Sequence, residues 1–108
     1  MEELALEFNN VHALYKCYMS FIKEGGLFVV TNRKYEMGHS LALNVLLPNA
    51  IEPIVVTGRV CWITPPASHS SAPQGVGVSF ITDKHQLKDR IETILGPMLN
   101  STEPTYTL

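Results

Sequence analysis

The alternation of apolar and polar residues predicts that most of this chain forms short β-strands. In residues 4–8, leucine and phenylalanine alternate with alanine and glutamate, a period of two that is typical of a half-buried strand. Similar runs follow at 27–31, 41–47, 54–64 and 75–81. Turns rich in glycine, proline and asparagine separate them, and a serine- and proline-rich loop spans 65–74. Short strands at regular spacing predict a mainly β protein built as a small antiparallel barrel.

The longest predicted strand, residues 54–64, carries a glycine at its middle. A glycine inside a strand often marks a bulge or a bend, so Gly58 predicts a bend of the kind that closes a barrel. If the alternation holds along the whole strand, Val56, Val60 and Trp62 share one face.

Residues 11–22 fit neither the strand nor the helix pattern well. Apolar side chains recur at helical spacing from Val11 to Ile22, but the aromatic and β-branched content favours a strand. We therefore expect an irregular segment with at most one helical turn. Its tyrosine, methionine and phenylalanine side chains are of types enriched in protein–protein interfaces, and they are equally suited to completing a small core.

A helix and a polar tail are predicted to follow the strands. The helix is expected at 83–95, because Asp83 can cap its first turn and an apolar stripe runs from Leu87 to Leu95. Gly96 and Pro97 end it. Residues 97–108 are polar and rich in turn residues, so their composition favours a frayed, flexible tail over a docking peptide.

Length and charge narrow the class of protein. At 108 residues the chain forms one domain, residues 1–96, followed by the tail. The net charge is −2, which argues against a nucleic-acid-binding barrel. The acidic first residues do not resemble a secretory signal, and the apolar runs are too short to span a membrane. We expect a soluble intracellular monomer in which Cys17 and Cys61 are free thiols.

Motifs for catalysis and cofactor binding are missing from the sequence. Gly75-x-Gly77 lacks the third glycine of a dinucleotide-binding turn, and no Walker-type loop or nucleophile elbow occurs. The four histidines do not have metal-ligand spacing. We therefore predict that the protein is not an enzyme and holds neither a cofactor nor a metal.

Three features together resemble the PilZ-domain family. They are the Gly25-Gly26 turn leading into an apolar strand, the final strand Gly-Val-Gly-Val-Ser-Phe at 75–80, and the helix after it. The resemblance covers residues 4–96 and implies a six-stranded PilZ-type β-barrel. The family is best known as a receptor for cyclic di-GMP. It binds the nucleotide through an Arg-x-x-x-Arg segment ahead of the barrel and an Asp/Asn-x-Ser-x-x-Gly turn.

This sequence departs from the family's nucleotide-binding pattern. With Gly26 aligned on the glycine of the turn, Phe21 replaces the Asp/Asn and Lys23 replaces the Ser. The first arginine of the chain is Arg33, beyond the turn, so the arginine pair is absent. Charged hydrogen bonds contribute about 1.5–3 kcal/mol each, so losing two removes roughly two to four decades of affinity. We therefore expect no direct cyclic di-GMP binding.

The degenerate site resembles that of a narrower group within the family, the type IV pilus assembly proteins. The segments Ala13–Phe21 and Glu103–Leu108 resemble that group's patterns, which shifts the expectation for the tail toward docking. The resemblance implies a bacterial cytoplasmic adaptor that binds the pilus-extension ATPase PilB at the inner-membrane pilus machinery. In some bacteria it also implies the EAL-domain protein FimX as a partner. The expected partner-binding residues are an exposed set, Tyr15, Tyr18, Met19 and Phe21, together with Pro104 and Tyr106 of the tail.

The sequence also leaves open a direct cyclic di-GMP receptor with a non-standard site. In that alternative Lys16, Lys23 and Arg33 would stand in for the missing arginines. Arginine and lysine are not equivalent here, because only the guanidinium offers a planar fork to a phosphate or a guanine edge.

Overall fold

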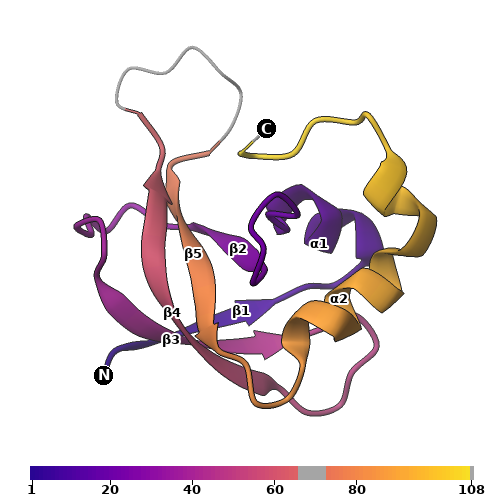
Figure 1. The fold of residues 1–108 in the computed structure, drawn as a ribbon, viewed down its shortest axis with the longest axis horizontal. Helices are drawn as coiled ribbons and strands as arrows, with labels where there is room; N and C mark the ends of the chain where they lie inside the picture. The colour runs from indigo at the N-terminus through magenta and orange to yellow at the C-terminus, as the bar shows by residue number, and fades with distance from the viewer. Residues whose placement is uncertain (66–72, 108) are drawn as a thin grey trace.

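The computed structural model describes residues 1–65 and 73–107, which form one curved sheet with two α-helices beside it (Figure 1). In chain order the elements are β1 (Glu3–Glu7), α1 (Val11–Cys17), β2 (Gly26–Val30), β3 (Ser40–Leu46), β4 (Ile54–Ile63), β5 (Gly75–Thr82), α2 (Leu87–Leu95) and the 3₁₀-helix η1 (Gly96–Asn100). The five predicted strands are thus present. Most of the loop predicted at 65–74 lies outside the described residues.

The sheet is an open half-barrel rather than a closed six-stranded one. Among the described residues its strand order is β1-β3-β4-β5-β2, which leaves β1 and β2 as edges. The prediction of an all-antiparallel sheet is wrong for β1, which runs parallel to β3. The reason is that the chain does not return directly from β1 as a hairpin. It forms α1 first, and residues of β1, α1 and β2 line a pocket of about 290 Å³ between the two edge strands.

Two irregularities bend the long strand β4 against β5. The pairing shifts between Thr57 and Gly58, which confirms the bulge predicted there. A second shift falls between Val60 and Trp62, so Val60 pairs with Val78 whereas Trp62 pairs with Gly77. The prediction that Val60 and Trp62 share a face is therefore wrong, because the extra residue between them reverses the alternation. Trp62 instead lies edge-on to Phe28 of β2, with ring centroids 5.7 Å apart.

Residues 11–17 form a regular helix, so the expectation of an irregular segment is wrong there. Asn10 caps α1 by accepting a hydrogen bond from the Ala13 amide at 2.8 Å. Leu14 and Tyr15 of α1 are buried, at 0% and 6% exposure. Because packing of an apolar face stabilises a short helix more than intrinsic propensity does, the helical spacing outweighed the aromatic content.

The final helix begins later than predicted. α2 starts at Leu87 rather than near Asp83, and Leu87, Ile91 and Leu95 form its buried stripe. Asp83 still caps it from the preceding turn, since its carboxylate accepts hydrogen bonds from the amides of Leu87 at 2.6 Å and Lys88 at 3.0 Å. Among the helices of the described residues, none combines the length and apolar character needed to cross a membrane.

Candidate functional site

The turn that leads into β2 is built by its own backbone. The Ile22 amide donates to the Met19 carbonyl, and the Gly25 amide donates to the Ile22 carbonyl at 2.9 Å. Gly25 has a φ of +86°, a conformation that favours glycine, and its carbonyl accepts from Phe80 of β5. A Cβ on Gly26 would lie 2.8 Å from the Val78 carbonyl oxygen. Gly25 therefore allows the bend of the chain, and Gly26 allows its backbone to approach β5 closely.

The side chains at the nucleotide-binding positions of this turn are exposed. Phe21 is 51% exposed and Lys23 is also exposed. They present an aromatic ring and an ammonium group at positions where the family's nucleotide-binding turn has short oxygen-bearing side chains, Asp or Asn and Ser. That this turn does not bind a nucleotide stays a prediction.

Two of the three cations considered as substitutes, Arg33 and Lys16, lie beside acidic side chains. Arg33, in the connection between β2 and β3, forms an ion pair with Glu2. The Tyr35 hydroxyl also donates to Glu2, and this bond, followed by the charge of Arg33, holds the pKa of Glu2 below its ordinary value. Lys16 lies on α1, where its ammonium is 4.0 Å from a Glu103 carboxylate oxygen.

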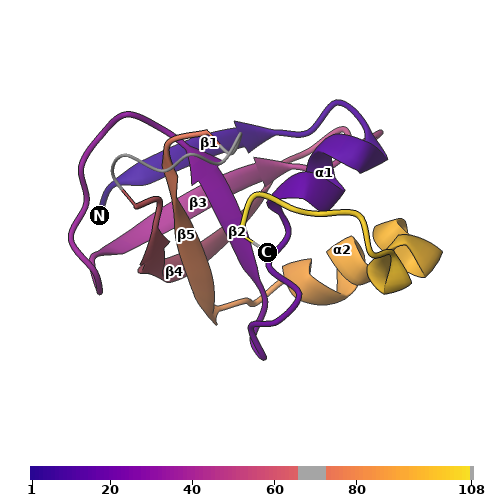
Figure 2. The same ribbon diagram turned by 90° about the horizontal axis from the view of Figure 1, so that it is seen from above.

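Most of the aromatic set expected on the surface is buried. Tyr15, Tyr18 and Met19 are 6%, 3% and 0% exposed, so the expectation that they are exposed is wrong. They are covered because α1 packs against the sheet and the tail lies over α1 (Figures 1 and 2). Of this N-terminal set, Phe21 is the exposed member. Whether these residues bind a partner stays a prediction.

The Tyr18 hydroxyl and the Cys17 thiol are held in their neutral forms. Tyr18 donates to a Glu92 carboxylate oxygen at 2.6 Å, and burial together with that carboxylate raises the pKa of Tyr18. Burial raises the pKa of Cys17 to about 11, so this free thiol carries little thiolate. Within residues 1–65 and 73–107, His, Cys, Asp and Glu side chains do not gather in groups of three that could hold a metal.

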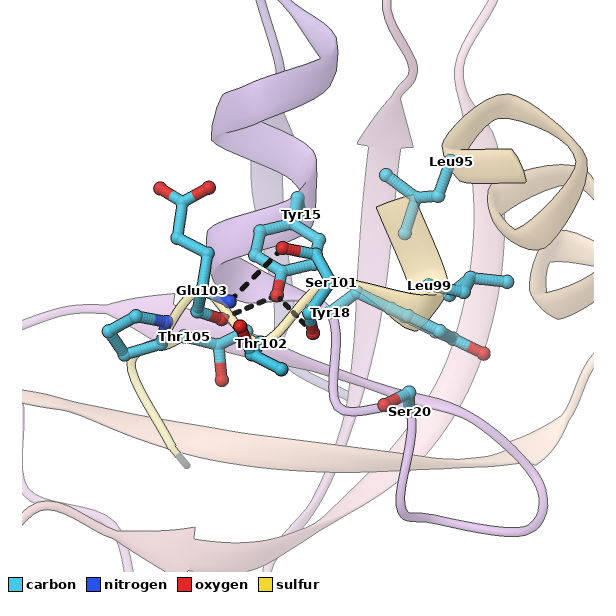
Figure 3. A pocket seen from close by; sticks show the side chains of 10 residues that line it. Tyr15, Tyr18, Ser20, Leu95, Leu99, Ser101, Thr102, Glu103 and Thr105 are labelled. Atoms are coloured by element: carbon cyan, nitrogen blue, oxygen red, sulfur yellow. Dashed lines mark hydrogen bonds between the residues drawn. The ribbon is translucent and has the colours of Figure 1, made fainter. Parts of the chain in front are cut away.

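The described part of the tail packs against α1, so the prediction of a frayed tail is wrong there. The Tyr15 hydroxyl donates to the Glu103 carbonyl and lies 3.4 Å from the Ser101 carbonyl (Figure 3). The Ser101 hydroxyl in turn accepts from the Glu103 amide at 3.0 Å. A buried tyrosine thus fixes the start of the tail through backbone groups.

Polar contacts of Glu103 and an aromatic contact of Tyr106 hold the rest of the tail. The Glu103 carboxylate lies 2.8 Å from the His12 imidazole and close to Lys16, and these neighbours, His12 first, lower the pKa of Glu103. Further along, the Tyr106 amide donates to the Lys16 carbonyl at 3.0 Å. The Tyr106 ring packs on Phe28, with centroids 5.6 Å apart.

A cavity of about 360 Å³ remains between the tail, α1 and the α2–η1 segment. Its lining combines apolar and polar side chains, shown in Figure 3: Tyr15, Tyr18, Ser20, Leu95, Leu99, Ser101, Thr102, Glu103, Pro104 and Thr105. The Thr105 hydroxyl oxygen is buried and has no hydrogen-bond partner. Because a buried hydroxyl normally finds a partner, the tail fits this surface incompletely.

Sequence reasoning missed the residues on α1 and β2 that receive the tail. His12 and Phe28 were not singled out as site residues, and the pairs they form span long stretches of chain, as His12 and Glu103 do. No local pattern reports such a contact. The family's turn motif could point only to Phe21 and Lys23, whose side chains are exposed.

Comparison with known families agrees with the geometry of the turn and the half-barrel. A family model described as the PilZ domain matches residues 3–96. No individual curated protein matches the chain significantly. PilZ domains are non-enzymatic binding and adaptor modules, and the match indicates a regulatory or adaptor role related to cyclic di-GMP. Since the match covers most of the 108 residues, the chain belongs to the PilZ-domain family.

Proposed function

We propose that this protein is a non-enzymatic adaptor of type IV pilus biogenesis and twitching motility. It binds the pilus-extension ATPase PilB and, where one exists, the EAL-domain protein FimX, without binding cyclic di-GMP itself. One observation carries the proposal: in the turn before β2, exposed Phe21 and Lys23 stand at the positions of the family's ligand groups.

Loss of direct nucleotide binding follows from the chemistry of that turn. A cyclic dinucleotide carries two phosphates and two guanine edges, which arginine forks bind well and a single ammonium binds poorly. The chain has no arginine ahead of the turn, and Arg33 beyond it is paired with Glu2. The backbone bend alone therefore leaves a site without its principal hydrogen bonds.

Partner binding is supported by the surface next to the turn. Phe21 is an exposed aromatic side chain on the loop that follows α1, and the tail on α1 brings Pro104 and Tyr106 to the same helix. Aromatic side chains of this kind often anchor protein interfaces. The segments around Phe21 and Tyr106 are also those that resemble the type IV pilus assembly group.

A pull-down with the N-terminal region of PilB tests the proposal. Phe21→Ala is the most informative single change, because the side chain is exposed and its removal should leave the fold intact. We expect Phe21→Ala to reduce retained PilB. The matched control is Lys23→Ala, an exposed change in the same turn. Failure of the wild-type chain to retain PilB would contradict the proposed partner, and unchanged binding by Phe21→Ala would contradict the proposed site.

A further inference from the structure

The tail occupies a surface that has the character of a peptide-binding groove. We call this surface the α1–β2 groove and define it by His12, Tyr15 and Lys16 of α1 and Phe28 of β2 (Figure 3 shows its Tyr15 end). Two of its hydrogen bonds reach only backbone groups of the tail, the Glu103 carbonyl and the Tyr106 amide. Any segment that runs the same course could make both bonds.

Two side chains of the tail supply the chemical selectivity. The Glu103 carboxylate lies against the His12 imidazole, 2.8 Å away, and the Lys16 ammonium, 4.0 Å away. Three residues later, the Tyr106 ring packs on Phe28, and the Lys16 ammonium lies 5.9 Å from the ring centroid. The groove therefore recognises an acidic residue followed by two others and then an aromatic ring.

The tail is held weakly enough to be exchanged. Its ion pair is solvent-exposed, with 56% exposure for the His12 side chain and 42% for Glu103, and exposed ion pairs stabilise little. The cavity beneath the tail and the unpaired Thr105 hydroxyl show that its packing is incomplete. A segment that filled this cavity and buried no unpaired hydroxyl would bind better than the tail does.

We propose that residues 101–107 are an internal occupant of the α1–β2 groove, and that a partner protein enters it with its own acidic–x–x–aromatic segment. The tail then acts as a competitor that keeps the groove closed until such a partner is present. The existence of that partner rests on the adaptor function proposed above, whereas occupancy of the groove by the tail does not.

A titration of the full chain with a fluorescent peptide of sequence Ser-Thr-Glu-Pro-Thr-Tyr-Thr-Leu tests the groove. In the wild-type chain the attached tail competes at an effective concentration of about millimolar, so the free peptide should bind weakly. Tyr106→Ala in the full chain loosens the tail and leaves every groove residue in place. If the tail fills the groove in nine of ten molecules, this variant should bind the peptide about tenfold more tightly.

Three controls distinguish binding in the groove from nonspecific binding of the peptide. Thr107→Ala in the full chain should bind the peptide as the wild type does, because Thr107 carries none of the contacts above. Peptides with Gln in place of Glu, or Ala in place of Tyr, should bind the Tyr106→Ala chain more weakly than the parent peptide. Equal binding by wild-type and Tyr106→Ala chains, or equal binding of the three peptides, would overturn the proposal.

Binding of PilB to the same full-length variants distinguishes this proposal from the adaptor function. Tighter binding by Tyr106→Ala supports a partner segment that replaces the tail. Weaker binding means that PilB contacts the docked tail itself, which overturns the competitor role and leaves the adaptor function standing. If neither chain binds PilB, the adaptor function with PilB fails, and the peptide titration still decides whether the groove exists.

Discussion

The glycine turn and the α1–β2 groove are held together in opposite ways. The turn is fixed by local backbone hydrogen bonds around Ile22 and Gly25, and its side chains at 21 and 23 project into solvent. The groove is formed by side chains from α1 and β2 that meet residues of the tail far away in sequence. The fold of the turn therefore does not depend on the side chains at 21 and 23, whereas the groove depends on what its side chains contact.

The largest loss of stability should come from adding a methyl group at Gly26 in the turn. Gly26→Ala places a Cβ 2.8 Å from the Val78 carbonyl oxygen and 2.9 Å from Ile22, which is overpacking against a fixed strand. We expect a loss of about 1–3 kcal/mol in the free energy of unfolding, measured by urea denaturation.

Lys23→Ala is the matched control for Gly26→Ala, because it removes an exposed side chain three residues earlier. Its unfolding free energy should stay within about 0.5 kcal/mol of the wild type. A destabilised Lys23→Ala, or a neutral Gly26→Ala, would show that the turn is held by its side chains instead.

An intermediate effect is expected where the groove meets the tail. Tyr15→Phe keeps the buried ring and removes the hydroxyl that donates to the Glu103 carbonyl. We expect a loss of about 0.5–1.5 kcal/mol and faster amide exchange in residues 103–106. Tyr35→Phe removes a comparable hydroxyl bound to Glu2 and should leave exchange in the tail unchanged. Slow tail exchange in Tyr15→Phe would contradict the role of this hydroxyl.

The smallest effect concerns pH. The pKa of Glu103 is lowered in the folded chain, chiefly by His12, so the ionised carboxylate favours the docked tail. This contribution is fully present above the ordinary glutamate pKa of 4.5 and is lost as the pH falls through the lower folded value. The protection factor of the Tyr106 amide, which corrects its exchange rate for the intrinsic rate at each pH, should therefore fall at acidic pH. In Glu103→Gln this protection factor should be lower at neutral pH and lose that dependence, and an identical pH profile in the two chains would exclude the ion pair.

Sequence patterns predicted the local elements and missed the long-range contacts. Alternation and short apolar runs identified the five strands of the described residues, and Gly58 marked its bulge, because both depend on neighbouring residues. The parallel pairing of β1 and the reversal at Trp62 could not be read from the sequence, since both depend on which strand lies alongside. The same holds for the tail: its composition predicts fraying, and contacts with residues distant in sequence, such as Tyr15 and Phe28, oppose it.

The central claim about the turn is that it does not bind cyclic di-GMP. Calorimetric titration of the nucleotide into the full-length protein measures this without reference to any partner. The loss of two or more charged hydrogen bonds predicts no saturable heat at micromolar ligand. Saturable binding at micromolar concentration, abolished by Lys23→Ala or Arg33→Ala, would contradict the account and establish a receptor with a non-standard site.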